Sequence, residues 1–144
     1  MTEHRTLIFT VAVLYSLDEK WRGIATSRSF DDILENRCGV NLHRAWLSLK
    51  REGLLGEFSD WFCYDPLYGG SNLRDILRVA QIRYLLIRLG GSDLSYHLDE
   101  VSPQAIEQLL RRENISPELV KQVSARLNFL LDEQATLVKS PTSV

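Results

Sequence analysis

The sequence predicts a mainly α-helical protein, an irregular bundle of five or six helices with little or no sheet. Two observations support this prediction. Long segments carry apolar residues at helical spacing, and serine, proline and glycine stand where helices begin and end. The chain has 144 residues, 44% of them hydrophobic, so it can bury a core without a metal or a disulfide. We therefore expect a single helical domain over residues 1–138 and a disordered tail over residues 139–144.

The first apolar segment runs from Arg5 to Trp21 and is apolar on every side of a helical wheel as far as Leu17. Its β-branched residues would also suit a buried strand over residues 5–17, and periodicity does not separate the two. We favour a buried helix, because few later segments could pair with such a strand. The clearly apolar part, Leu7 to Tyr15, is nine residues long, whereas a membrane span needs about 20.

Two helices are predicted between residues 29 and 52. Ser29 is a typical N-cap for the first of them, which should end near Gly39. The second helix runs from Asn41 to about Glu52 and should end at Gly53. Its apolar residues share one face: Leu42, Ala45, Trp46 and Leu49.

The segment from residue 58 to residue 70 is a loop of unusual composition, with neither a helical nor a strand period. Five aromatic residues fall within eleven positions: Phe58, Trp61, Phe62, Tyr64 and Tyr68. Aromatic side chains are enriched where proteins bind one another, so the candidate partner-binding residues are Trp61, Phe62, Tyr64 and Tyr68. The alternative is a small local core that ties the loop down, because large aromatic side chains are mostly buried.

Ser71 or Asn72 should begin the strongest predicted helix, Leu73 to Leu89, which is apolar around most of its circumference. One narrow basic strip lies on this helix: Arg74, Arg78 and Arg88. The strip could face a phosphate, RNA or an acidic partner, or it could pair with internal acids or water. The segment from Asp93 to Leu98 fits either a short helix or an extended link.

Two Ser-Pro pairs predict the last two helix starts. In Ser102-Pro103 and Ser116-Pro117, serine is a good N-cap and proline fits the first helical position, where no N–H is needed. The final helix carries an apolar stripe: Leu119, Val123, Leu127, Leu130 and Leu131. This stripe either packs on the protein's own bundle or meets a partner or a second copy.

The sequence lacks the spacing of the common catalytic, metal and cofactor sites. His4, His43 and His97 lie far apart, and there is no CxxC, HExxH, GxSxG or glycine-rich phosphate loop. Cys38 and Cys63 have no metal or redox spacing, so we expect reduced thiols in a cytoplasmic protein. We expect no enzyme, no metal site, no cofactor and no small-molecule substrate.

Residues 29–55 have the outline of a helix-turn-helix, whose second helix enters the DNA major groove. Gly39-Val40-Asn41 resembles its turn, and Leu49 to Leu54 resembles the end of its recognition helix, about three residues closer than usual. The resemblance implies a nucleic-acid-binding regulator that uses the helix over residues 41–51. Its candidate contacts are His43, Arg44, Ser48, Lys50 and Arg51. The alternative is a pair of ordinary packed helices with a solvated basic face.

The net charge of the chain bears on the choice between a protein-interaction module and a nucleic-acid-binding regulator. With 17 basic and 19 acidic residues the formal net charge is −2, which argues against a strongly basic nucleic-acid binder but leaves local basic patches open. The first hypothesis is therefore a non-catalytic helical interaction module, an adaptor or a small subunit of a larger assembly. It would bind a protein partner or self-associate, and it would bind through the aromatic loop and a neighbouring helix face. The alternative is the helix-turn-helix regulator.

Overall fold

The structure, a computed structural model, describes residues 2–23, 41–67, 70–76, 78, 87–88, 96–97 and 103–139. Helices dominate these residues: α1 (Thr2–Gly23), α3 (Leu42–Arg51), the 3₁₀ helix η2 (Gly56–Trp61), α5 (Pro103–Arg112) and α6 (Pro117–Lys139). Four two-residue strands form two antiparallel pairs: β1 (Tyr64–Asp65) with β2 (Gly70–Ser71), and β3 (Ile87–Arg88) with β4 (Tyr96–His97). The predicted mainly helical fold is confirmed.

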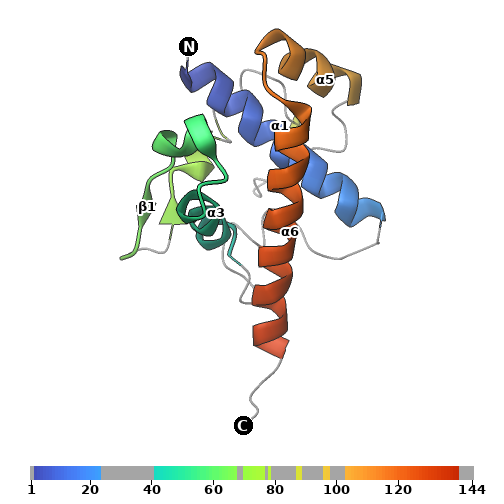
Figure 1. Ribbon diagram of the computed structural model, residues 1–144. Coiled ribbons are helices and arrows are strands. Elements are labelled where there is room, and N and C mark those ends of the chain that lie inside the picture. Colours follow the sequence, from blue (N-terminus) through green and yellow to red (C-terminus); the bar gives the residue numbers. More distant parts are fainter. Residues whose placement is uncertain are drawn as a thin grey trace.

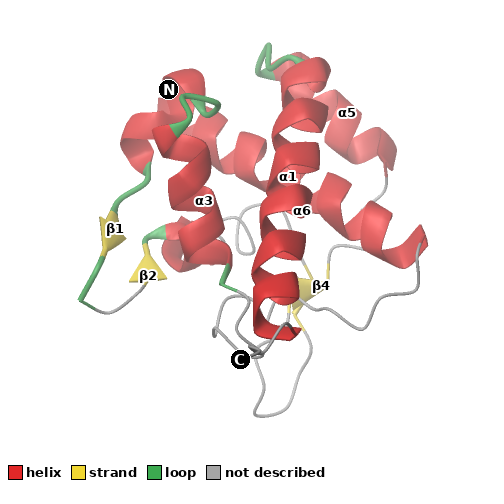
Figure 2. Ribbon diagram, turned by 60° about the horizontal axis from the view of Figure 1, so that its bottom comes forward, coloured by secondary structure: helices red, strands yellow, loops and turns green. Residues whose placement is uncertain are grey.

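The helices pack around α1. Helix α6 crosses α1, and α5 covers one part of it (Figure 1). Helix α3 lies beside α6, and the β1–β2 hairpin packs on α3 at some distance from α6 (Figure 2). None of the helices in the described part of the chain has the length and hydropathy that a membrane span requires.

The middle of helix α1 is buried on every side. From Thr6 to Tyr15 each side chain is at most 5% exposed, so this segment forms the centre of the hydrophobic core. A helix that is hydrophobic all round is stable in water only when other elements surround it. The buried hydroxyl of Thr10 donates a 2.8 Å hydrogen bond to the Thr6 carbonyl, which satisfies it within the helix. The favoured reading of this segment as a buried helix is confirmed.

Helix α3 begins and ends as the sequence predicts. The Asn41 side chain caps it by accepting a hydrogen bond from the Arg44 N–H, 3.0 Å away. At the other end Gly53 has a φ of +76°, which glycine adopts without strain. Its N–H donates to the Lys50 carbonyl, and the Leu54 N–H donates to the Leu49 carbonyl. This pair of bonds is the Schellman motif, and it turns the chain toward η2.

Both predicted Ser-Pro helix starts are also confirmed, since Pro103 begins α5 and Pro117 begins α6. The Ser116 hydroxyl accepts a hydrogen bond from the Leu119 N–H. The apolar stripe of α6 packs on the protein's own core: Val123, Leu127 and Leu131 are fully buried, and Leu119 and Leu130 are partly buried against them.

The prediction of a helix from Leu73 to Leu89 is wrong at the C-terminal end of this segment. Residues 73–76 are helical, but Ile87 and Arg88 form strand β3 and pair with β4. A continuous apolar run fits a helix and a buried strand equally, and here backbone pairing with Tyr96 and His97 decides. Of the ambiguous segment from Asp93 to Leu98 the structure describes only these two residues, and they are extended.

Two further predictions lie outside the described residues. They are the helix expected after Ser29 and the tail from residue 140 onward. Lys139, which we placed in the tail, is the last residue of α6.

Two leucines test the assignment of the core. Leu127 of α6 is fully buried in the hydrophobic core, whereas Leu67 is 88% exposed. We expect Leu127→Ala to lower the free energy of unfolding by about 2–5 kcal/mol, because it removes core contacts and leaves a cavity. The same change at Leu67 should alter it by less than about 0.5 kcal/mol. Urea denaturation of both variants checks this, and equal effects would contradict the burial assigned to α6.

Candidate interaction surface

The aromatic residues of the loop divide between the core and the surface. Phe58 is buried and stacks on Phe9, with ring centroids 4.2 Å apart. Phe62 is 3% exposed and packs against Trp46 at 5.1 Å. The prediction that Phe62 binds a partner is therefore wrong, because its ring completes the protein's own core. For these two residues the alternative of a small local core is the correct one.

Side chains from outside the loop hold its backbone in place. The Asn72 side chain accepts a hydrogen bond from the Cys63 N–H and donates one to the Trp61 carbonyl. The Lys50 ammonium donates to the Phe62 carbonyl at 2.6 Å. Three consecutive residues of the loop are thus tied to α3 and to the start of the following helical turn. Such ties fix the direction in which the Trp61 side chain leaves the backbone.

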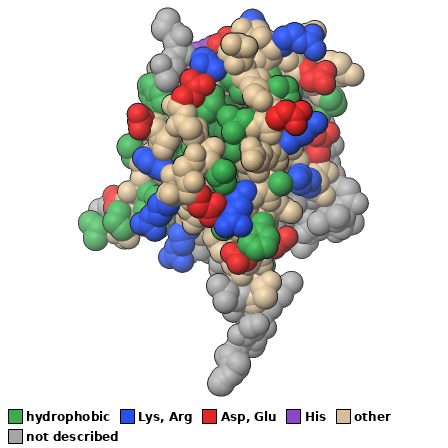
Figure 3. Space-filling view, in the orientation of Figure 1, with side chains coloured by type: hydrophobic (Ala, Val, Ile, Leu, Met, Phe, Trp, Pro, Cys, Tyr) green, Lys and Arg blue, Asp and Glu red, His purple; other side chains and the backbone are tan. Residues whose placement is uncertain are grey.

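Three other described side chains of this loop reach the surface. Trp61 is 36% exposed, Leu67 is 88% exposed, and Tyr64 is half-buried. We call these three residues the hairpin surface. Apolar side chains gather at the projecting end of the β1–β2 hairpin, at the lower left of the molecule in Figure 3. The other predicted member, Tyr68, lies outside the described residues.

Leu67 is a residue of this surface that our reading of the sequence missed. It follows Asp65-Pro66, a typical start of a turn, and turns lie at the surface. The Asp65 carboxylate accepts a hydrogen bond from the Leu67 N–H at 2.9 Å, which shapes the turn locally. The Asp-Pro-Leu sequence therefore held the signal that would have placed Leu67 in water.

His43 is not available to a nucleic acid. It is 4% exposed, and its Nδ1 accepts a hydrogen bond from the Ser71 N–H at 3.0 Å. The Ser71 hydroxyl lies 2.8 Å from the same nitrogen and accepts a bond from the Leu73 N–H. Because Nδ1 is the acceptor, the proton of the neutral ring is assigned to Nε2. The predicted contact at His43 is wrong, since this residue joins α3 to β2.

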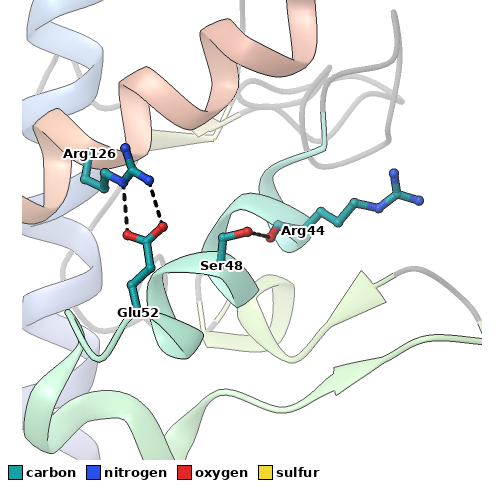
Figure 4. Close-up of polar contacts among 4 residues, drawn as sticks. All are labelled: Arg44, Ser48, Glu52 and Arg126. Carbon is teal, nitrogen blue, oxygen red and sulfur yellow. Dashed lines mark hydrogen bonds and ion pairs between the residues drawn. The ribbon is translucent and has the colours of Figure 1, made fainter. Parts of the chain in front are cut away.

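The exposed face of α3 keeps three of the five predicted nucleic-acid contacts together. Arg44 and Arg51 are exposed, and the Ser48 hydroxyl on the same face donates to the Arg44 carbonyl. Figure 4 shows the Arg44 guanidinium pointing away from the neighbouring ion pair of Glu52. The fifth predicted contact, Lys50, turns to the loop instead.

Two polar ties hold α3 antiparallel to α6. Near the C-terminus of α3, Glu52 accepts two hydrogen bonds from Arg126, at 2.9 and 2.8 Å (Figure 4). At the N-terminus the Asn41 N–H donates to the Gln134 side chain at 2.6 Å, and that amide donates back to the Asn41 carbonyl. The Arg126 guanidinium also lies over the ring of Phe129, 5.0 Å from its centroid.

The Glu52–Arg126 pair changes the titration of its carboxylate. The hydrogen bond from Arg126 holds the pKa of Glu52 below its usual value, and the positive charge of Arg126 acts in the same direction. Partial desolvation of Glu52 opposes this shift. The ion pair therefore stabilises the packing of α3 on α6 when Glu52 is ionised.

The predicted basic strip does not lie on a single helix. Arg74 is half-buried, and Arg78 is exposed with its guanidinium 3.9 Å from the Asp75 carboxylate. Arg88 belongs to strand β3, so it does not continue the line of the other two. Within the described ranges no three His, Cys, Asp or Glu side chains are grouped closely enough to hold a metal ion.

Comparison with known proteins identifies no relative. No protein-family model, no curated protein and no solved structure matches this chain. The function is therefore inferred from the chain's own residues, and the hairpin surface and the exposed face of α3 are the two candidates.

Glu52→Gln tests the tie between α3 and α6. Because the pKa of Glu52 is lowered on folding, its ion pair adds stability above the ordinary value of 4.5 and loses it as pH falls through the folded-state pKa. We expect E52Q to unfold at lower urea concentration than the wild type near neutral pH, with little difference in acid. Glu107→Gln, an exposed residue of α5, is the control and should match the wild type at both pH values. A loss for E52Q that is independent of pH would contradict this account.

Proposed function

We propose that this protein is a non-catalytic helical interaction module, an adaptor or a small subunit of a larger assembly, which binds a protein partner through the hairpin surface. One observation carries the proposal. Trp61 and Leu67 hold apolar area in water. The Asn72 and Lys50 side chains fix the backbone of residues 61–63, and the Leu67 N–H donates a hydrogen bond to the Asp65 carboxylate.

A surface whose backbone is fixed before binding pays a low entropic cost when it binds. Affinity is the surplus that remains after side chains and loops are ordered, so a loop that is ordered before binding loses less. Covering the Leu67 side chain would contribute about 1.5–3 kcal/mol, because it is almost fully exposed in the free protein. Tryptophan is among the residues that most often dominate the binding energy of an interface.

The test compares partner capture by three forms of the full chain. Wild type, the double variant Trp61→Ser with Leu67→Ser, and Phe129→Ser are used as baits in host extract treated with nuclease. Phe129 is a matched control, because it is 50% exposed but lies on α6. We expect the double variant to lose a stoichiometric protein partner by at least about 10-fold, a loss of about 1.4 kcal/mol, and the control to keep it.

Thermal unfolding of each bait shows whether the fold survives. If the double variant unfolds, Leu67→Ser alone replaces it, because that side chain contributes almost nothing to the core. If all three baits retain the partner equally, the hairpin surface is not its binding site.

A second candidate function is nucleic-acid binding through α3, the use that the helix-turn-helix outline implies. The observation in its favour is that Arg44 and Arg51 lie on one exposed face and form no ion pair with another described residue. They are seven residues apart, which is about 10 Å along a helix. Figure 3 shows Lys and Arg side chains over α3 with acidic ones interspersed.

Fluorescence anisotropy with labelled duplex DNA and single-stranded RNA tests this second candidate. If Arg44 and Arg51 each neutralise a phosphate, replacing both with Ala should weaken binding and reduce the slope of log K against log salt by roughly 1.4–1.8. The matched control replaces Arg111 and Lys121, two exposed cations of α5 and α6. Equal effects of the two double variants would assign any binding to net charge rather than to α3.

A further inference from the structure

His43 joins α3 to the β1–β2 hairpin through one ring nitrogen. Its Nδ1 accepts a hydrogen bond from the backbone N–H of Ser71, 3.0 Å away, and the Ser71 hydroxyl lies 2.8 Å from the same atom. An imidazole nitrogen accepts a hydrogen bond only while it carries no proton. The contact between α3 and β2 is therefore made by the neutral form of a side chain that titrates near physiological pH.

A second proton on the ring would break this contact. Because Nε2 already carries the first proton, the second is taken up at Nδ1, which then becomes a donor. The Ser71 hydroxyl can turn and accept a hydrogen bond from this donor, but the backbone N–H of Ser71 cannot turn. Two N–H groups would face each other across 3.0 Å, and a half-buried amide would lose its acceptor. Protonated His43 therefore no longer holds β2 in its place.

The surroundings of the ring also disfavour a positive charge. His43 is 4% exposed, and the cavity beside it measures about 10 Å³, which leaves room for about one water molecule. A charge that water does not reach is costly to bury. Lys50 lines the same cavity, and its ammonium repels a second cation. From the hairpin, Cys63 brings a thiol and Tyr64 a phenol to this cavity.

The charged groups of the elements next to α3 lie outside this cavity. Asp65 and Asp75 line the outer groove of the hairpin, and Arg74 adds a positive charge in the helical turn after β2. From α6, the Arg126 guanidinium is paired near the C-terminus of α3, and Gln134, which contacts the N-terminus, is neutral. No described carboxylate thus shares the cavity with the imidazole ring, where it could stabilise the protonated form.

We propose that His43 is a pH-sensitive clamp, in which the neutral ring holds β2 on α3 and protonation of Nδ1 releases β2. The clamp stabilises the attachment above the pH range in which histidine takes up its proton, and this stability is lost as pH falls through that range. The release is local, because Phe62 before the strand and Leu73 after it are buried in the core. The device goes beyond the proposed interaction function and does not depend on what the hairpin surface binds.

Amide hydrogen exchange of the full chain, followed by NMR and corrected for the intrinsic effect of pH on exchange, tests the clamp. Two conditions, about pH 7.5 and about pH 5.5, bracket the titration of histidine. Both lie above 4.5, the ordinary value for Glu52, so its ion pair stays intact. We expect the protection of the Ser71 N–H to fall roughly 10-fold in acid, the effect of losing one buried hydrogen bond. The N–H of Ile115, which donates to the Leu110 carbonyl in the α5–α6 turn, is the internal control and should keep its protection. Equal protection of Ser71 at both pH values would overturn the proposal.

His43→Asn assigns the effect to this ring. An amide oxygen can replace Nδ1 as the acceptor but takes up no proton, so the protection of Ser71 in H43N should be the same at both pH values. His4→Asn removes a half-buried histidine of α1 and is the matched control, which should keep the pH dependence of the wild type. A pH dependence that persists in H43N would overturn the clamp.

The ring nitrogens of the wild type give a measurement that holds even if H43N does not fold. Their ¹⁵N chemical shifts report which nitrogen carries a proton at each pH. We expect a proton to appear at Nδ1 of His43 over the same pH range in which the Ser71 N–H loses its protection. A ring that stays neutral at about pH 5.5, or one that is protonated while Ser71 keeps its protection, would contradict the proposal.

Discussion

The burial of the middle of α1, from Thr6 to Tyr15, is the constraint on which the rest of this fold depends. A helix that is apolar on every side has no face to turn toward water, so other elements must cover it all round. Helix α6 crosses it, α5 covers a further part, and η2 supplies the Phe58 ring that stacks on Phe9. Near the start of α1, the Arg5 guanidinium donates to the Glu57 carboxylate and to the Asn114 carbonyl, which joins η2 and the α5–α6 turn to the central helix.

The exposure of the hairpin surface follows from the same constraint. Phe58 and Phe62 are drawn into the core against α1 and α3, and the chain between and beyond them must then return to the surface. Trp61 and Leu67 lie on that returning part. Helix α3 supports it, because the ties to Arg126 and Gln134 hold α3 on α6 at both ends. The part of this surface around Trp61 therefore stands on a packed support.

Part of the candidate site could be predicted from sequence. The density of aromatic residues marked the loop, and Trp61 and Tyr64 reach its surface. The sequence could not show that these two side chains reach the surface while Phe62 is buried. The burial of each ring depends on contacts with α3, which is distant in the sequence. For the same reason His43 could be mistaken for an exposed contact. Its partner, Ser71, is 28 residues away, and only the folded chain brings the two together.

The sequence by itself determined where the helices begin and end, because these boundaries depend on local interactions. Asn41, Gly53 and the two prolines act through hydrogen bonds or dihedral angles within a few residues, so their effects need no tertiary contact. Tertiary structure alone decided the outcome where an apolar run fits two conformations. Residues 87–88 became a strand because residues 96–97 offer backbone partners, and α1 stayed a helix because other helices surround it. Burial and long-range pairing depend on what packs nearby, and a residue's own neighbours in sequence do not specify that.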